Sequence, residues 1–508
     1  MSRANEPLFQ ELSLPEKLQR LRLTFGNSSD LVTRELAPDP AGYTPAAIIY
    51  MDGIVNILSV NEIVDSLLQM TYQVDPDAER SAPEWRQLLS RVPIPSGHIR
   101  NLTNVPDIEM AILSGETVML LEHSDEYIAI DTIGGEKRTV GEPSTETVVR
   151  GPREGFTENL RTNAALVRRK IKDTNLWLET RRIGRITKTD VGIMFLNGIA
   201  QDSVVQEIRA RLDRIDIDAV LESGYIEEMI QDEATSVFPT MTSSERPDTI
   251  AANLLEGRVA IFVDGTPFVL LAPVLFIQFF QAAEDYYNRF NFSVIRLLRL
   301  FSFMIALLGP ALYIALTTFH QEAIPTQLLI SLAAQREGVP FPAFVEALIM
   351  EITFEILREA GVRMPRAIGQ AVSIVGALVL GDAAVQAGLV SPAMVIVVSL
   401  TAISNFVIPA YDLALSVRLL RFVFMMLAAS FGLFGISVGM IALVVHLCSL
   451  RSFGVPFMAP MAPLSLAGLK DSLIRFPFWR LHKRPRFLSP NNRVREHSSG
   501  PRKPSSRK

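Results

Sequence analysis

Long runs of uncharged, mostly apolar residues between positions 300 and 450 restrict the fold of this chain more than any other feature. Residues 300–319, 391–411 and 422–450 contain no Asp, Glu, Lys or Arg, and residues 371–390 contain only Asp382. A helix of about 20 such residues spans roughly 30 Å, the thickness of the hydrocarbon core of a bilayer. A buried core helix explains one such run but not three. We therefore predict a polytopic α-helical membrane bundle at 300–450, with four spans, or six as the alternative.

The charged residues divide the chain into three regions. The net charge is −16 for residues 1–290, +1 for residues 291–469 and +10 for residues 470–508. This distribution excludes a single soluble globule and predicts a soluble region, a membrane region and a basic tail. The single cysteine, Cys448, excludes an intrachain disulfide and a cysteine metal cluster.

The positions of the two termini relative to the membrane follow from the flanking residues. The first residues lack the apolar core of a signal peptide, and basic residues follow the last predicted span. We expect both termini on the cytosolic side, which requires an even number of crossings. We expect the basic tail, residues 451–508, to be disordered after about residue 490.

A predicted helix at residues 343–359 carries carboxylates within an otherwise apolar sequence. At helical spacing Glu351, Glu355 and Glu359 share one arc of about 100° with Arg358, and Glu346 lies opposite. A charged stripe facing lipid costs roughly 3 kcal/mol per residue, so the stripe must face water or protein. One interpretation is the lining of a cation path, because carboxylates select cations. The other is an amphipathic helix at the membrane surface or against the soluble region.

Two further acids lie near membrane depth. Asp382 is a candidate intramembrane acid, placed where two helices meet. Asp412 has Arg418 and Arg421 close by in the sequence, which predicts a salt bridge at a helix end.

Three residues are candidates for helix packing or bending. Pro310 lies in the middle of the first predicted span and predicts a kink. Gly435 and Gly439 have the GxxxG spacing that lets two helix backbones approach closely.

The soluble region is predicted to hold two small α/β units. Apolar runs bounded by turn residues predict strands at 46–50, 117–123, 127–132 and 189–196, with a hairpin at 259–274. Helices are expected at 61–70, 157–172 and 203–214. We assign residues 1–44 to a helical or flexible segment, 45–187 to the first unit with a basic helical linker, 188–275 to the second unit and 276–299 to an interfacial helix.

Sequence motifs of catalysis and cofactor binding are missing. The chain has no GxxxxGK[ST], GxGxxG after a strand, HExxH or GxSxG, and its six histidines are scattered. We therefore expect no enzyme activity, no cofactor and no metal site. The basic cluster at 168–188 lies in an acidic region, so pairing within the protein is favoured over nucleic acid.

Several segments resemble the A-subunit family of bacterial spore germination receptors, the GerA type. They are RGPREGFTENLRTN (150–163), LLEGRVAIFVDGTPFVL (254–270), EDYYNRF (284–290), FEILREAGVRMPRAIGQAVSIVGALVLGDAAV (354–385) and RSFGVPFMAP (451–460). The resemblance runs from about residue 30 to 490. It implies a nutrient-responsive receptor subunit in the inner membrane of the spore, with its soluble region on the core side.

The resemblance also implies partners and a mechanism. The partners are a transporter-like B subunit, a lipoprotein C subunit and further copies of this chain. The implied activity is conduction of monovalent cations by an oligomer that opens on germination. The alternative is a non-conducting scaffold or relay subunit, in the same complex or in a paralogous complex linked to dipicolinate release. A secondary transporter is disfavoured because the hydropathy shows no inverted repeat.

Overall fold

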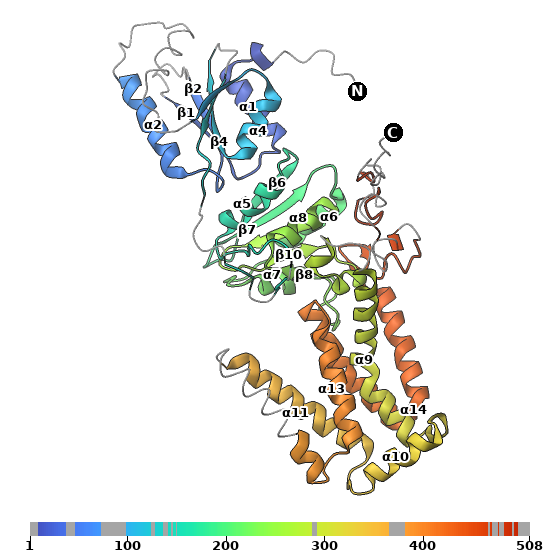
Figure 1. Ribbon diagram of the computed structural model, residues 1–508. Coiled ribbons are helices and arrows are strands. Elements are labelled where there is room, and N and C mark those ends of the chain that lie inside the picture. Colours follow the sequence, from blue (N-terminus) through green and yellow to red (C-terminus); the bar gives the residue numbers. More distant parts are fainter. Residues whose placement is uncertain are drawn as a thin grey trace, which may run out of the picture. The chain divides into compact units, whose positions relative to one another are not determined.

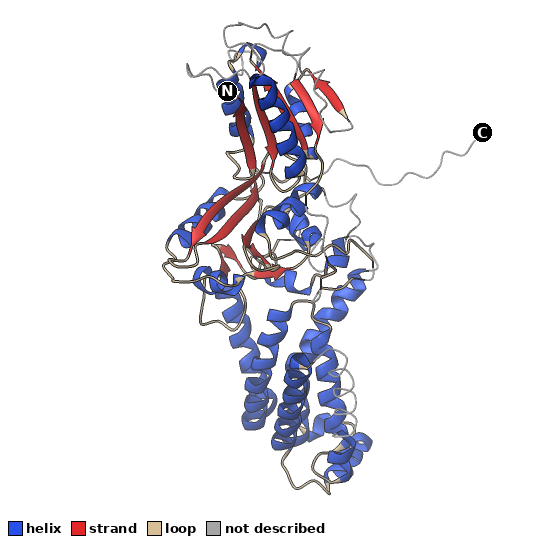
Figure 2. Ribbon diagram, turned by 90° about the vertical axis from the view of Figure 1, so that its left-hand side faces the viewer, coloured by secondary structure: helices blue, strands red, loops and turns tan. Residues whose placement is uncertain are grey.

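The computed structural model describes residues 9–36, 46–72, 98–122, 127–135, 141–143, 146–148, 150–286, 292–364, 381–465, 468–469, 476, 482–489 and 492–495. The chain forms two compact units (Figure 1). Unit 1 comprises Met1–Gln231, Ser243–Pro273 and Lys483–Arg495, and unit 2 comprises Asp232–Thr242, Val274–His482 and Glu496–Lys508. The two five-stranded sheets lie in unit 1 and the long helices lie in unit 2 (Figure 2).

The first half of unit 1 is built on a five-stranded sheet in the order β1-β2-β4-β5-β3. All four strand pairs are antiparallel. The elements of this half are α1 (Leu14–Thr24), β1 (Leu31–Leu36), β2 (Ala46–Met51), α2 (Ile57–Tyr72), β3 (Ile99–Leu102), α4 (Val105–Ser114), β4 (Glu116–Leu121) and β5 (Tyr127–Asp131).

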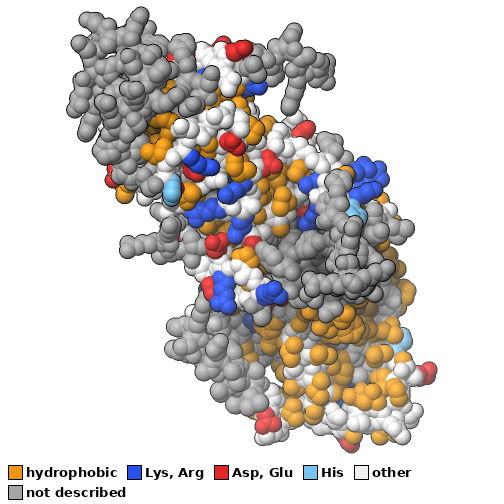
Figure 3. All heavy atoms as spheres, turned by 45° about the horizontal axis from the view of Figure 1, so that its top comes forward, with side chains coloured by type: hydrophobic (Ala, Val, Ile, Leu, Met, Phe, Trp, Pro, Cys, Tyr) orange, Lys and Arg blue, Asp and Glu red, His pale blue; other side chains and the backbone are white. Residues whose placement is uncertain are grey.

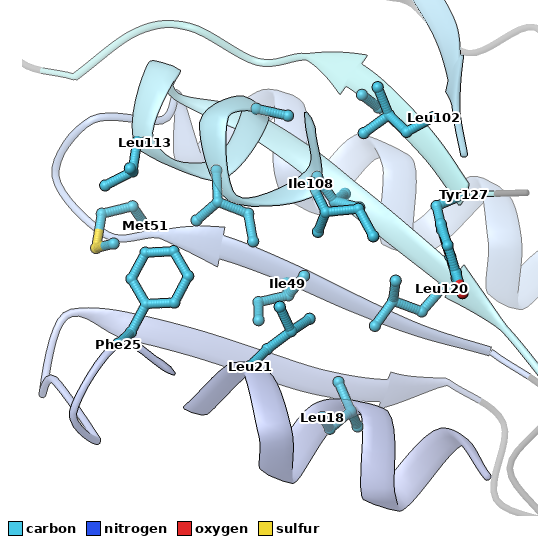
Figure 4. Packing of buried hydrophobic residues seen from close by; sticks show 14 of the residues in the cluster. Leu18, Leu21, Phe25, Ile49, Met51, Leu102, Ile108, Leu113, Leu120 and Tyr127 are labelled. Atoms are coloured by element: carbon cyan, nitrogen blue, oxygen red, sulfur yellow. The ribbon is translucent and has the colours of Figure 1, made fainter. Parts of the chain in front are cut away.

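Helices cover both faces of this sheet, so β2 is buried along its whole length. Ile49 and Met51 pack with α1 and α4 on one face, as Figure 4 shows. Ile48 and Tyr50 point to the opposite face and pack with α2. Because side chains alternate along a strand, an unbroken apolar run such as β2 requires this three-layer arrangement.

Local signals set the ends of α4. The Asn104 side chain accepts a hydrogen bond from the Asp107 backbone N–H, and Pro106 occupies the first turn. Gly115 ends the helix at φ 91°, in the left-handed region that glycine adopts most easily. The helix is thereby placed directly before β4.

The second half of unit 1 repeats the pattern with the sheet order β6-β7-β9-β10-β8. Helices α5 and α8 pack on one face, and Arg209 of α6 lies over the Phe195 ring on the other. The elements are α5 (Leu160–Lys170), β6 (Leu176–Ile183), β7 (Thr189–Leu196), α6 (Asp202–Asp213), α7 (Ser223–Ile230), β8 (Thr242–Ser244), α8 (Pro247–Leu255), β9 (Val259–Val263) and β10 (Val269–Ala272).

A segment near the C-terminus belongs to unit 1. The Arg484 Nε donates to the Leu255 carbonyl at 2.8 Å, Leu488 is buried, and Lys483 forms a β-bridge with Val494. The predicted disorder after about residue 490 is wrong for residues 492–495, which take part in this contact. Residues 496–508 lie outside the described residues.

Unit 2 is a helical bundle. Its helices are η2 (Phe276–Phe280), η3 (Ala283–Tyr286), α9 (Phe292–Thr318), η4 (Gln321–Ala323), α10 (Thr326–Arg336), α11 (Ala343–Arg363), α13 (Pro392–Phe406) and α14 (Tyr411–Ser449). Residues 381–386 are also helical. The short strands β11 (Arg451–Ser452) and β12 (Val455–Pro456) follow α14.

Helix α14 is a hairpin of two helical arms. Gly432 has φ 59° and ψ −140°, which is not helical. A Cβ built on Gly439 would lie 3.0 Å from the Phe424 ring, although 15 residues of straight helix would separate the two by roughly 22 Å. Ser416 and His446, near the two ends of α14, both bond the same segment, at Val237 and Ser236. The two arms therefore run antiparallel and reverse at Gly432.

Hydrophobic side chains cover much of the face of unit 2 seen in Figure 3. Exposed apolar residues lie on every long helix, among them Phe301, Ile356, Ile396, Ile403, Phe431, Phe434 and Val445. Within the described residues two helices, Ser293–Thr318 and Tyr411–Ser449, are long and apolar enough to cross a membrane. At 15 residues, α13 is shorter than the predicted span at 391–411, and the span at 371–390 lies mostly outside the described residues.

The predicted elements of unit 1 agree with the structure at β2, β4, β5, β7, α2, α5 and α6 and at the β9–β10 hairpin. Three assignments need correction. The boundary predicted between residues 187 and 188 cuts through the second sheet, because β6 pairs with β7. The segment 1–44 contains the strand β1, which pairs with β2. The interfacial helix at 276–299 is instead two 3₁₀ helices, η2 and η3, followed by α9 from Phe292.

Glu146 of unit 1 gives a pH-dependent prediction. Burial raises the pKa of its carboxyl above the ordinary 4.5, although Ser244 Oγ donates to Oε2 at 2.6 Å. The protonated carboxyl therefore stabilises the fold at low pH, and this contribution is lost as the pH rises through the raised pKa. Glutamine does not titrate, so the free energy of unfolding of Glu146→Gln, relative to that of the native protein, should increase from pH 4 to pH 7. Chemical denaturation at each pH measures this free energy of unfolding. Glu142→Gln, at an exposed carboxyl, is the control. If the free energy of unfolding of both variants changed equally with pH, the prediction would be contradicted.

Candidate functional site

The candidate site is the row of carboxylates on α11, a helix that packs against α9, α13 and α14. Glu346 and Glu351 are fully buried, Glu355 is partly exposed, and Glu359 is 59% exposed. Isoleucines occupy the exposed face of the same helix, at Ile349, Ile352 and Ile356. The first three carboxylates thus face into the bundle and not toward its surroundings.

Glu351 forms an ion pair with an arginine of α14. Arg421 Nη1 donates to Glu351 Oε2 at 2.6 Å, and the Arg421 side chain is 2% exposed. Breaking such a buried pair by removing one partner costs about 3–5 kcal/mol. The pair therefore fixes the position of α11 relative to α14.

Glu355 is neutralised by two arginines one turn further along. Arg358 of the same helix donates to its Oε2 at 2.5 Å, and Arg418 of α14 lies 3.3 Å from the same oxygen. Glu359 pairs with Arg363 at the exposed end of the helix.

Glu346 is held by the start of α13 instead of by α14. Its Oε1 accepts hydrogen bonds from the backbone N–H of Ser391, at 2.6 Å, and from the Ser391 hydroxyl. Ser391 is the N-cap of α13, where the helix dipole stabilises negative charge. Arg336 of α10 lies 3.7 Å from Oε2. The carboxylate thus joins α10, α11 and α13.

The other predicted residues lie apart from this row. Asp382 is exposed and accepts a hydrogen bond from Gln386 at 2.7 Å. The predicted salt bridge of Asp412 with Arg418 or Arg421 is wrong, because both arginines pair with α11 carboxylates. They point across to α11, where they neutralise the buried Glu351 and the partly exposed Glu355.

Two glycines predicted for helix packing lie beside the reversal of α14. A Cβ added to Gly439 would meet Leu427 Cδ1 at 2.8 Å, and one added to Gly435 would meet the Leu427 carbonyl. The GxxxG spacing thus brings the two arms of one hairpin together. Pro310 lies within α9 as predicted.

Electrostatically the row is close to neutral. Each of the three inward carboxylates has an arginine within 4 Å, from Arg336, Arg358, Arg418 and Arg421. Among the described residues no group of three or more His, Cys, Asp or Glu is placed to hold a metal ion. The arrangement is suited to joining helices through charge pairs. The sequence shows the carboxylates and the arginines of α14, but no spacing rule pairs residues 70 positions apart.

Comparison with known proteins places the chain in a family. The family model described as Bacillus/Clostridium GerA spore germination protein matches residues 19–487. Spore germination protein KA of Bacillus subtilis (strain 168) is 49% identical over 492 residues, which are 96% of this chain and 89% of that protein. Spore germination protein GerLA of Bacillus cereus is 40% identical and covers 94% of this chain and 96% of that protein.

A solved structure was also found. The N-terminal domain of the A subunit of the Bacillus megaterium spore germinant receptor GerK3 is 40% identical, with a TM-score of 0.41, and the match covers 52% of this chain and 96% of that chain. The match of the family model over nearly the whole sequence, with relatives that extend over most of its length, leads to one conclusion. The chain belongs to the GerA family of spore germination proteins.

Proposed function

We propose that this chain is the A-type subunit of a nutrient-responsive germinant receptor in the spore inner membrane, and that unit 2 contributes a path for monovalent cations. The family acts in spore germination and is not known as an enzyme family. The two long apolar helices of this chain, Ser293–Thr318 and Tyr411–Ser449, indicate membrane association. The observation that carries the proposal is the α11 row: Glu346 and Glu351 lie inside an apolar bundle, where ionisable residues are costly and mark ion pathways.

The directions of the described helices support a multi-pass arrangement. Glu355 pairs near the start of α14 and Glu351 one turn further, so α11 runs antiparallel to the first arm. Gly309 of α9 lies against Thr401 of α13, and both arms of α14 begin or end beside Ser236 and Val237. With both termini proposed on the core side, the number of crossings is even, four or six.

The test is potassium release from spores that carry Glu351→Gln together with Glu355→Gln. Glutamine keeps the size and the hydrogen bonds but removes the charge. Without that charge we expect the barrier to cation passage to rise by about 1.4 kcal/mol or more, so nutrient-triggered release should slow by about tenfold or more. Glu359→Gln, on the same helix but exposed, is the matched control. Normal release at a normal protein level would refute the role of this row in the path.

A second function is favoured by one observation, the neutrality of the row. Carboxylates that are all paired with arginines present little free charge to a passing cation. This state fits either a closed path or a scaffold subunit that relays the signal while ions pass elsewhere, including in a paralogous complex linked to dipicolinate release. Conductance of the purified chain in liposomes separates the two: a chain that never conducts is the relay subunit.

The partners are part of the same proposal. The GerK3 protein is named as the A subunit of a receptor, which implies further subunits. We propose a transporter-like B subunit, a lipoprotein C subunit and further copies of this chain, with both termini on the core side.

A further inference from the structure

Helix α9 contains a carbonyl that its own helix cannot satisfy. In an α-helix the N–H of residue 310 would donate to the carbonyl of residue 306, but residue 310 is proline and has no N–H. Ala306 is fully buried, so water does not reach this carbonyl from the surface of the unit. An unsatisfied backbone group in a water-free bundle costs several kcal/mol. A donor from elsewhere in the chain is required.

Arg421 of α14 supplies that donor. Its Nε donates to the Ala306 carbonyl oxygen at 2.7 Å, while Nη1 of the same guanidinium donates to Glu351 at 2.6 Å. One side chain therefore joins α9, at the carbonyl that Pro310 leaves without a donor, to α11 and α14. We call Arg421, Glu351 and Ala306 the Arg421 clamp.

The geometry shows that the carbonyl competes with the carboxylate for this arginine. An arginine free to optimise its ion pair forms two parallel bonds to a carboxylate. Here Arg421 makes a single bond to Glu351, and both Arg421 Nη2 and Glu351 Oε1 are buried without a hydrogen-bond partner in the described structure. The guanidinium is thus turned so that Nε meets Ala306. The contact with the carbonyl is part of what positions the side chain.

Helix α13 meets the same point. A Cβ added to Gly309, the residue before the proline, would lie 2.8 Å from Thr401 Oγ1 of α13. Four helices therefore meet near Pro310 of α9. A change in the Arg421 clamp alters the packing of all of them.

We propose that Arg421 is a positioning residue of the closed receptor subunit: it replaces the donor that Pro310 removes from α9 and holds α9, α11 and α14 together until germination is triggered. The link to germination rests on the proposed function. The hydrogen bond from Arg421 to the Ala306 carbonyl, which Pro310 leaves without a helical donor, does not depend on that function, so the two parts are tested separately.

The first experiment is a double-mutant cycle with the full-length chain in detergent. Arg421→Lys keeps the charge for Glu351 but loses the fork that reaches both partners. We expect its melting temperature to fall by several degrees. Pro310→Ala restores the N–H for Ala306, so Arg421→Lys with Pro310→Ala should recover most of the loss. Arg418→Lys, one turn away on α14 and paired with Glu355, is the control, and Pro310→Ala should shift its melting temperature only as much as it shifts that of the native chain. Additive effects at positions 310 and 421 would overturn the pairing.

The second experiment measures germination of spores with the same variants. We expect Arg421→Lys to lower the nutrient concentration for half-maximal germination about tenfold, or to raise spontaneous germination, and Pro310→Ala to reverse this change. A structural role alone would reduce the protein level and the response without shifting the concentration. If the cycle shows coupling but the nutrient concentration for half-maximal germination stays unchanged, the role of Arg421 in holding the subunit closed is overturned. The proposed function is decided separately, by the potassium-release test at Glu351 and Glu355.

Discussion

Replacing Arg168 by methionine should lower the free energy of unfolding of unit 1 by about 3–5 kcal/mol, because it leaves a buried carboxylate without its partner. Arg168 of α5 is fully buried and forms a bidentate pair with Asp30, through Nε and Nη2, and Nη2 also reaches Ser28 Oγ at 2.8 Å. Ser28 and Asp30 precede β1, so this pair joins the two sheets of unit 1. Chemical denaturation of the full chain in detergent measures the loss.

The controls for Arg168 separate burial from charge. Arg182→Met removes an arginine that is 76% exposed and pairs with Asp190, and an exposed pair is worth at most about 1 kcal/mol. Adding Asp30→Asn to Arg168→Met removes the unpaired charge and should recover part of the stability. Equal losses for Arg168→Met and Arg182→Met would show that the buried pair does not join the two halves.

Replacing Gly432 by alanine should destabilise unit 2 by roughly 2–6 kcal/mol, through two separate effects. The backbone at φ 59° and ψ −140° is open almost only to glycine. An added Cβ would also lie 2.7 Å from His320 Cε1 and 2.9 Å from Phe319 Cβ, at the end of α9. Without this residue the two arms of α14 cannot reverse at this point against α9. Thermal unfolding in detergent and the protein level in the membrane measure the effect.

Gly338→Ala is the matched control for this prediction. It lies in the same unit between α10 and α11, and an added Cβ meets no atom within 4 Å. We expect its melting temperature to stay close to that of the native chain. A Gly432→Ala protein as stable as Gly338→Ala would mean that α14 does not reverse at Gly432.

Strand and helix positions were predictable where the local pattern was strong. The apolar runs of β2, β4 and β7 and the hairpin of β9 and β10 carry their own signals, because alternation and turn residues act over a few positions. Strand β1 was missed because its sequence, LVTREL, is half polar, and it becomes a strand by pairing with β2. The uncharged runs likewise predicted α9 and α14, but the reversal within α14 left no clear trace: Gly432 is one of several glycines in an apolar run.

The candidate site was predictable in its acids but not in their partners. Glu346, Glu351 and Glu355 stand out as charges within an apolar helix. Glu346 was expected on the side of the helix opposite Glu351, Glu355 and Glu359; it meets α13, whereas Glu351 and Glu355 meet α14. Asp412 was the nearer acid for Arg418 and Arg421 in the sequence, yet neither arginine pairs with it.

The amino-acid sequence by itself determined the separation of a charged part from an apolar part, the family, and the carboxylates placed where lipid cannot accept them. These three features depend on amino-acid composition and on the spacing of residues within one helix or strand, which can be seen along the sequence alone. Only the tertiary structure decided which arginine neutralises which glutamate, where α14 turns back, and which side chain satisfies the carbonyl that Pro310 leaves without a donor. The reason is physical: a buried charge or carbonyl is stabilised by whatever donor packing brings within about 3 Å, and that donor lies 70 or 115 residues away along the chain.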